Sequence, residues 1–237
     1  MNERFEKFKA ALAENLPEFN VKFKDESTFM KIIGKILFFN KTFMTGFVTT
    51  IGYTVYWPNR KKVDLGGQRV LATLAHEYRH AKDAKKTTPI LFGFLYLLPQ
   101  ILALPGLMSL ILIPLLIFGV VSWSWWMLSL MLTILFILPI PAYFRMRYEV
   151  NGYIMSMFIK YKLLKELGMD KIDIRDVLYI FIKNINKNFT ELNYYYMWPF
   201  GIEERLSKKV EKILSGEIIK EDKIYQEVAN ALKKSKI

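Results

Sequence analysis

The sequence predicts an α+β fold that is mostly helical, with a small sheet and a two-helix transmembrane hairpin. Two segments with alternating, β-branched or aromatic residues predict the sheet, at residues 20–24 and 47–57. Apolar residues at helical spacing fill most of the remaining chain. Between these parts, residues 87–144 form a run of 58 residues without one charged side chain, far longer than a core helix requires.

Composition limits the kinds of partner and of metal site. The chain has 34 Lys and Arg residues against 22 Asp and Glu, a net charge of +12, and no cysteine. Without cysteine there are no disulfides or thiolate sites, so a transition-metal site must use histidine and carboxylate. The positive charge indicates nucleic acid or an anionic membrane as a partner. Because no base-reading or stacking motif is present, we expect membrane lipid and no nucleic acid.

The N-terminal part predicts an amphipathic helix before the first strand and a second helix after it. Residues 3–15 place Phe5, Phe8 and Leu12 on one face, and Ser27 can cap a helix over residues 28–39. The charged start of the chain lacks the apolar core of a secretory signal, so we expect the N-terminus to stay in the cytoplasm.

The two histidines of the chain, His76 and His80, lie four residues apart around Glu77 in an HExxH pattern. A helix predicted over residues 68–86 puts both imidazoles on one face, where they can reach a single Zn²⁺, and Glu77 can contact the water that the metal activates. This layout is typical of a metallopeptidase. The alternative is an exposed helix with two surface histidines, and Arg79 departs from the uncharged residues usual inside the motif. The buried face of this helix would carry Val70, Leu71, Leu74, Tyr78 and Ala81.

A catalytic zinc usually has three protein ligands, so the motif needs one more. Glu149 is the best candidate, since on a helix it shares a face with Gly152 and Ser156, whose small size would let the motif helix approach closely. A structural alternative is that Glu149 only pairs with a neighbouring arginine.

Asp83 is the competing third ligand, because it lies on the same helix face as the histidines. Three ligands on one unbroken helix cannot easily surround an ion, however, and the metzincin pattern would need glycine here and histidine in place of Lys86. We therefore expect Glu149 to complete the site, with Asp83 or Arg145 as groups that support the ligands.

The apolar run has room for two spans of about 20 residues each, with a turn at residues 119–124. Basic residues flank both ends, which marks both for the cytoplasmic face and places the N-terminus, the active site and the C-terminus together on that side. Residues 89–100 could instead lie along the interface, and a soluble protein with a very apolar buried hairpin is the other alternative. Two sets of residues support these expectations. Tryptophans at the turn would lie at the membrane interface on the far side, and basic residues flank the run: Trp123, Trp125 and Trp126, and Lys82, Lys85, Lys86, Arg145 and Arg147.

An HExxH helix, a membrane hairpin and a glutamate on a following helix resemble the gluzincin membrane peptidases of the HtpX and prenyl-peptidase class. The resemblance implies a zincin core in which a strand before the motif helix can pair with an extended substrate, with Thr49, Thr50, Tyr53 and Val55 at its edge. The chain departs from that class in two ways. It reads Glu149-Val150-Asn151-Gly152-Tyr153 where those enzymes often read E-x-x-A-D, and it has no apolar span before the motif.

A second resemblance is to an uncharacterised group of small zincin-like proteins of bacteria and phages, which implies a fold and an activity but no substrate. The matching segments are a T-x-x-G-x-T-V-Y strand, the histidine-glutamate helix, the apolar run, an E-x-x-A-Y segment with Gly152 in the alanine position, and a late M-W-P-F at residues 197–200.

The C-terminal third predicts further helices, over residues 150–168, 176–187, 203–214 and 221–233, with Val177, Ile180 and Phe181 facing inward on the second. Tyr194, Tyr195 or Tyr196 could stabilise the oxyanion formed on a substrate, a task for which zincins use tyrosine or histidine. The structural alternative is that these tyrosines plug the core or lie at the membrane interface.

Together these observations predict a zincin core over residues 1–87, a membrane hairpin over residues 88–144 and a C-terminal helical part over residues 145–237 that carries the third ligand. The predicted function is that of a zinc peptidase acting on a peptide or protein substrate, with Glu77 as general base. The alternative is a non-enzymatic membrane protein whose hairpin inserts or binds partners, with at most a structural metal.

Overall fold

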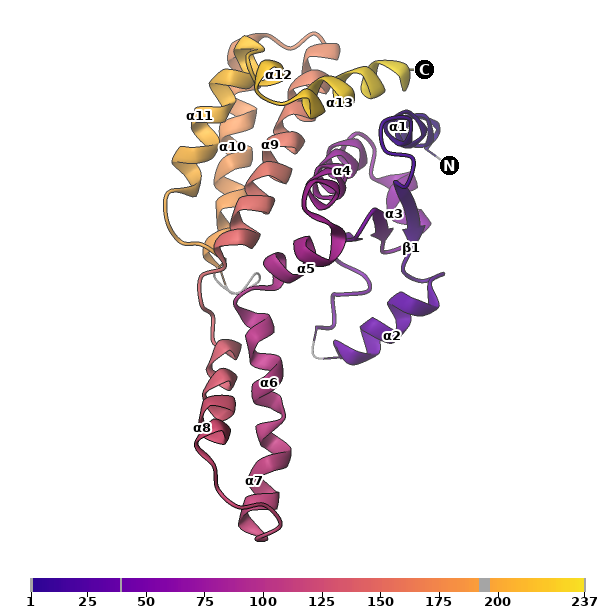
Figure 1. The fold of residues 1–237 in the computed structure, drawn as a ribbon. Coiled ribbons are helices and arrows are strands. Elements are labelled where there is room, and N and C mark those ends of the chain that lie inside the picture. The colour runs from indigo at the N-terminus through magenta and orange to yellow at the C-terminus, as the bar shows by residue number, and fades with distance from the viewer. Residues whose placement is uncertain (1, 39, 192–196, 237) are drawn as a thin grey trace.

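The computed structural model describes residues 2–38, 40–191 and 197–236, and it has an α+β fold that is mostly helical with a small sheet. Figure 1 shows a helical hairpin that leaves a body built from both ends of the chain. Two short segments, η1 and η2, are 3-10 helices. In chain order the elements are α1 (Glu3–Ala13), β1 (Asn20–Phe23), α2 (Thr28–Ile36), β2 (Thr49–Ile51), β3 (Thr54–Trp57), α3 (Arg60–Leu65), α4 (Arg69–Thr87), α5 (Pro89–Leu97), η1 (Gln100–Leu102), α6 (Ala103–Leu107), α7 (Ser109–Ile117), α8 (Trp125–Leu132), η2 (Thr133–Ile137), α9 (Tyr143–Glu166), α10 (Lys171–Thr190), α11 (Ile202–Ser215), α12 (Ile218–Glu221) and α13 (Lys223–Lys234).

The second predicted strand is wrong in one respect, because residues 47–57 fold back on themselves as a β-hairpin. Gly52 has a φ of 61°, a left-handed conformation that glycine adopts without strain, and it turns β2 back onto β3. β3 is the centre of the sheet, parallel to β1 and antiparallel to β2. Thr49 and Thr50 therefore lie on the edge strand as expected, whereas Val55 lies on the central strand and Tyr53 in the turn.

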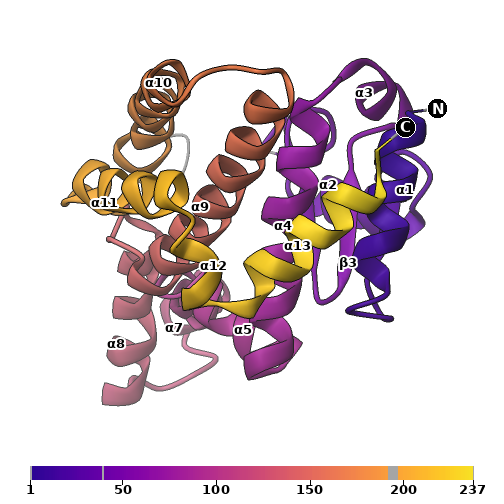
Figure 2. The ribbon, with the colours of Figure 1, turned by 90° about the horizontal axis from the view of Figure 1, so that it is seen from above.

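The core forms around α4, which packs along α9. The predicted buried face of the motif helix is confirmed, since all five of its residues are buried. Seen from above, α13 crosses over α4 and reaches α1, which brings the two ends of the chain together (Figure 2). Tyr78 on α4 donates a hydrogen bond to Glu227 on α13 at 3.2 Å. The motif helix is thus enclosed by elements from both ends of the chain.

The helix predicted over residues 176–187 begins earlier, as α10, because Asp170 caps it by accepting from the backbone N–H groups of Ile172 and Asp173. The predicted inward face is wrong at Ile180, which is 61% exposed, whereas Phe181 is half-buried against the core and Val177 is half-buried. The buried face follows the spacing Ile174, Leu178, Ile182, Ile185 and Phe189.

The apolar run forms a hairpin whose arms, α6 and α7 on one side and α8 and η2 on the other, lie against each other (Figure 1). Gly106 allows the close contact, because a Cβ atom at this position would lie only 2.4 Å from the backbone nitrogen of Ile134. The chain turns between Ile117 and Trp125, where the sequence predicts the turn. The hairpin is therefore a packed unit in itself.

Two membrane-spanning helices were expected, and the structure contains one candidate. Among the residues that the structure describes, Gln100–Ile117 is the helical run that is long and apolar enough to cross a membrane by length and composition. The returning arm, Trp125–Ile137, is apolar but shorter. The second predicted span is shorter because the helix ends before Leu138, and residues 138–142 continue without helical structure.

The first arm is not buried inside the chain, since only 17% of Gln100–Ile117 is buried. The hairpin is therefore not buried within the described part of the chain, as the alternative of a very apolar buried hairpin would require. The most exposed large apolar residues of the hairpin include Leu104, Met108, Leu110, Ile111, Ile117, Phe118, Val120 and Trp125.

A buried lysine holds the segment between α2 and β2 against the sheet. Lys24, directly after β1, is fully buried, and its Nζ donates to the backbone oxygen of Phe43 at 2.7 Å and lies 4.1 Å from the centre of the Phe43 ring. Burial lowers the pKa of Lys24 to about 8, although the negative charge of Glu77 acts in the opposite direction.

This lowered pKa predicts that stability rises with pH above pH 8. Below that pH both states hold the Lys24 proton, whereas between about pH 8 and pH 10.5 the unfolded chain keeps a proton that the folded chain releases. After allowance for solvent screening, we expect the wild type to gain about 1–2 kcal/mol of unfolding free energy relative to Lys24→Met between pH 8 and pH 10.

The measurement is urea unfolding of the detergent-solubilised protein at both pH values, with Lys22→Met on the exposed side of β1 as the matched control. The same pH dependence in the wild type and in Lys24→Met would contradict the prediction.

Candidate metal centre

Three buried side chains from two helices converge on one point. His76 and His80 come from α4 and Glu149 from α9, and all three are at most 8% exposed. The two Nε2 atoms are 3.0 Å apart. Oε2 of Glu149 lies 3.3 Å from Nε2 of His76, and Oε1 lies 3.4 Å from Nε2 of His80. The structure thus brings together the three residues that the sequence predicts as ligands.

These separations fit a metal ion. Donor atoms at about 2.0–2.1 Å from a tetrahedral zinc lie about 3.3 Å from one another, close to the distances between the three side chains. Each residue offers one ligand atom within 4.8 Å of the others. Two imidazoles and a carboxylate suit Zn²⁺ and also other first-row divalent metals. The cluster can therefore hold a metal ion whose identity the donor set alone does not fix.

The surroundings of His76 favour the tautomer that a metal requires. The hydroxyl of Ser156 donates to the backbone oxygen of Ala72 at 3.2 Å, which leaves its oxygen free to accept from Nδ1 of His76 at 3.5 Å. A proton on Nδ1 leaves the lone pair of Nε2 directed toward Glu149. Across the described residues, the buried Nδ1 of His80 has no hydrogen-bond partner.

The charges of the cluster depend on one another. Burial acts against the ionised form of Glu149, but its contacts with His76 and His80 outweigh burial and hold the pKa of this carboxyl well below its usual value. Burial also lowers the pKa of His80, and the contact with Glu149 more than compensates, so that the pKa is raised. Glu149 is therefore ionised in the folded protein, as a metal ligand must be.

Gly152 permits the close approach of α9 to the motif helix. A Cβ atom at this position would lie 2.6 Å from both Cε1 and Nε2 of His76, a separation that a side-chain carbon cannot adopt. Tyr153, the next residue, packs its ring against His76 with the ring centres 4.8 Å apart. The expectation that small residues next to Glu149 let the helices approach is therefore confirmed.

Glu77 lies outside the group of three ligands and beside the edge of the sheet. Its side chain is buried, and Oε2 accepts a hydrogen bond from the hydroxyl of Thr50 at 2.6 Å. Thr50 belongs to β2, the edge strand. The candidate general base is thus held between the motif helix and the strand that the resemblance to zincins places along the substrate.

A tyrosine that the sequence analysis did not select reaches the cluster. The hydroxyl of Tyr96, on α5, donates to Oε1 of Glu149 at 2.6 Å, and its ring lies 6.2 Å from that of His80. The signal in the sequence was a polar group within the apolar helix Pro89–Leu97. Tyr194, Tyr195 and Tyr196 lie outside the residues that the structure describes.

The turn into α5 explains how Tyr96 returns to the site. Thr88, between α4 and α5, has a φ of 94°, which a residue with a side chain rarely adopts. This turn directs α5 back against α4 and α9 (Figure 1). Arg145 then fixes the end of α5, since its Nε donates to the backbone oxygen of Tyr96 at 3.0 Å and its guanidinium to Gln100 at 3.1 Å. Arg145 contacts the tyrosine and reaches Glu149 only through it.

Asp83 is turned toward Arg79 and lies outside the group of three ligands. Nε of Arg79 donates to both carboxylate oxygens of Asp83, at 3.1 and 3.2 Å, and Asn151 donates to one of them at 3.4 Å. Arg79 also donates to Asp222, the cap of α13, at 2.9 Å. The charged residue inside the motif thus serves to connect α4 to the C-terminal helix.

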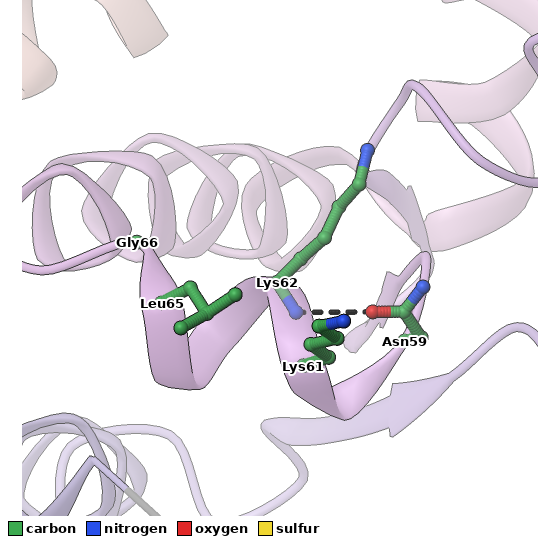
Figure 3. A pocket seen from close by; sticks show the side chains of 5 residues that line it. All are labelled: Asn59, Lys61, Lys62, Leu65 and Gly66. Carbon is green, nitrogen blue, oxygen red and sulfur yellow. Dashed lines mark hydrogen bonds between the residues drawn. The ribbon is translucent and has the colours of Figure 1, made fainter.

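A surface pocket elsewhere contains none of these residues. It lies at α3 and is lined by Asn59, Lys61, Lys62, Leu65 and Gly66, where the side chain of Asn59 caps the helix by accepting from the backbone N–H of Lys62 (Figure 3). The pocket lies at the capped start of α3, and His76, His80 and Glu149 are not among the residues that line it.

Comparison with protein-family models, with curated proteins and with solved structures finds no match for this chain. The function is therefore argued from the chemistry of the site.

The contact at Gly152 predicts that Gly152→Ala weakens metal binding about tenfold or more, because the new methyl group displaces the imidazole of His76. Competition with a chelating dye measures this affinity. Gly93→Ala, at a helical glycine with open space around it, is the matched control and should bind as the wild type does. Equal affinity in a correctly folded Gly152→Ala protein would show that the close contact does not hold the ligand.

Proposed function

We propose that this chain is a zinc-dependent peptidase anchored in a membrane, of the gluzincin type. The observation that supports it most strongly is the buried cluster of His76, His80 and Glu149, with Glu77 on the same helix but outside the ligand group. Two neutral imidazoles and a carboxylate, with a further carboxylate beside them, form the donor set of catalytic zinc sites in peptidases.

The roles of the residues follow from their positions. His76, His80 and Glu149 would hold the metal, which when bound lowers the pKa of a water molecule and polarises a carbonyl group. Glu77 would accept a proton from the attacking water and deliver it to the nitrogen of the leaving amine. The hydrogen bond from Thr50 holds the carboxylate of Glu77 in one orientation, which a proton carrier between two partners requires.

A peptide substrate is supported by the edge strand. Within the described part of the chain β2 is an edge strand, paired only with β3, and an extended peptide can add to such an edge through backbone hydrogen bonds. Since Thr50 on this strand contacts Glu77, a peptide paired with β2 would pass next to the general base. Tyr96, rather than Tyr194, Tyr195 or Tyr196, would donate a hydrogen bond to the oxyanion of the substrate, because its hydroxyl lies next to Glu149.

Membrane anchoring is supported by the exposed apolar surface of the hairpin. Gln100–Ile117 is long enough to cross a bilayer, and the returning arm brings the chain back to the body from which it left (Figure 1). Residues 138–142, which return to the body without helical structure, have one backbone group satisfied by a side chain, because Gln100 donates to the backbone oxygen of Ile140 at 2.9 Å. With basic residues at both flanks of the hairpin, the body, the site and both ends of the chain would lie on the cytoplasmic side.

A structural metal is the second candidate, and the closed site favours it. His76, Glu77 and His80 are each at most 8% exposed, and structural zinc sites are closed whereas catalytic ones keep an open position. In that case the chain would be a membrane protein without peptidase activity, and the metal would only hold α4 against α9.

Glu77→Gln distinguishes the two candidates. We expect this variant to bind metal as the wild type does but to lose at least about 100-fold in turnover, because an amide cannot carry the proton. The assay is cleavage of an unfolded labelled protein by the chain reconstituted in detergent, beside the measured metal content. Glu217→Gln, at an exposed glutamate, is the control.

Proteolysis that survives in Glu77→Gln would exclude this glutamate as the base. A wild type that is inactive despite a full metal content would favour the structural role.

A further inference from the structure

The helix α2 leaves an apolar face uncovered. Phe29, Ile32 and Ile36 lie on one side of the helix at the spacing i, i+3 and i+7, and they are 51%, 54% and 66% exposed. Phe38, just beyond the helix, is 80% exposed. Isolated exposed apolar residues are ordinary on protein surfaces, but a contiguous stripe of large ones indicates a surface that something else covers.

The opposite side of α2 holds it to the protein. Met30 is its buried residue, and Gly34 lies so close to Met44 that a Cβ atom would be 2.8 Å from the sulfur. The positions of Met30 and Gly34 are about 100–200° around the helix from the residues of the apolar stripe. The stripe therefore lies mostly outside the face with which α2 packs on the body, and the ring of Phe29 is the part of it near the body, 6.4 Å from that of Tyr56 on β3.

The place of α2 in the fold relates the stripe to the hairpin. α2 lies on the side of the body from which the hairpin leaves, and its axis runs across the hairpin direction (Figure 1). α5, at the base of the hairpin, also exposes apolar residues, with Ile90 at 87% and Leu97 at 46%. A membrane that surrounds the hairpin would thus meet the body at the level of α2.

The charge of α2 and the segment after it indicates which kind of surface covers the stripe. Residues 27–48 contain three basic residues and no acidic one, Lys31, Lys35 and Lys41, whereas Asp25 and Glu26 directly precede the helix cap. Lys31 and Lys35 are exposed and lie beside the stripe. An apolar stripe flanked by lysines is the pattern of a helix that lies in the plane of an anionic membrane, with its lysines reaching toward the headgroups.

We propose that α2 is a second membrane contact, which lies in the headgroup region of an anionic bilayer with Phe29, Ile32 and Ile36 inserted at its boundary. The proposal rests on the membrane anchoring proposed above for the hairpin. The hairpin alone would leave the body free to tilt and rotate about its base. A second contact fixes the orientation of the body, and with it the height of β2 and of the metal cluster above the membrane surface.

The test uses the full chain reconstituted in vesicles of phosphatidylcholine and phosphatidylglycerol. Because the natural chain has no cysteine, single cysteines can be introduced and labelled with a polarity-sensitive fluorophore. Ile32→Cys and Ile36→Cys report on the stripe, Ile111→Cys on the hairpin, and Lys208→Cys on an exposed part of α11. Spin-labelled lipids quench a label that is in the membrane, and iodide quenches one that is in water.

We expect shallow lipid quenching at positions 32 and 36, deep quenching at 111, and iodide quenching only at 208. Replacing both lysines, as Lys31→Gln with Lys35→Gln, should shift the docking equilibrium about fivefold per lysine toward the undocked state. The same shift is expected in vesicles of phosphatidylcholine alone.

Lipid quenching at 111 together with iodide quenching at 32 and 36 would overturn the proposal and leave the anchoring intact. Labels at 32 and 36 that neither quencher reaches would mean that a protein surface, such as a second copy of the chain, covers the stripe, and this also overturns it. Absence of lipid quenching at all positions would overturn the anchoring as well.

Discussion

The close packing of α9 on the motif helix is the contact on which the rest of the structure depends. Two of the three cluster residues lie on one helix, and the third reaches them only because a glycine, Gly152, stands where any side chain would collide with His76. The long hairpin separates these two helices in the sequence, so their packing must hold against the entropy of closing that loop. Other elements pack around this contact from outside, with α1 against α4, α10 and α11 against α9, and α13 against both helices.

The base of the hairpin and the metal cluster share a set of side chains. α5 begins at the strained turn of Thr88 and carries the hydroxyl of Tyr96 to Glu149, while Arg145 holds the end of the same helix. A change in the packing of the hairpin would therefore alter the position of Glu149 through its hydrogen bond with Tyr96. In an enzyme with the proposed anchoring, the membrane would influence the site through this connection, and α2 would set the orientation of the body.

The features that the sequence predicts best are those fixed by local spacing. His76 and His80 share a helix face by geometry alone, and Glu149 with Gly152 follows the same rule on the next long helix. The predictions that were wrong depend on the choice between local alternatives or on distant contacts. β-forming residues lie on both sides of Gly52, so composition cannot tell one strand from a hairpin. Ile180 is exposed, although it lies on a helix next to the residues of the buried face. The hydroxyl of Tyr96 stands out within an apolar helix, but spacing does not name its partner, because the contact with Glu149 depends on the direction that the chain takes after a single residue with positive φ.

The metal content of the detergent-purified protein, measured by elemental mass spectrometry, tests whether His76, His80 and Glu149 together hold a metal ion. Wild type is compared with Glu149→Ala and with Glu203→Ala, which removes an exposed carboxylate from α11. We expect about one zinc per chain in the wild type and in the control, and much weaker binding in Glu149→Ala, because two imidazoles alone bind zinc less tightly than the three-residue site. Wild-type protein without bound metal after zinc is supplied, or equal binding in all three proteins, would contradict this expectation.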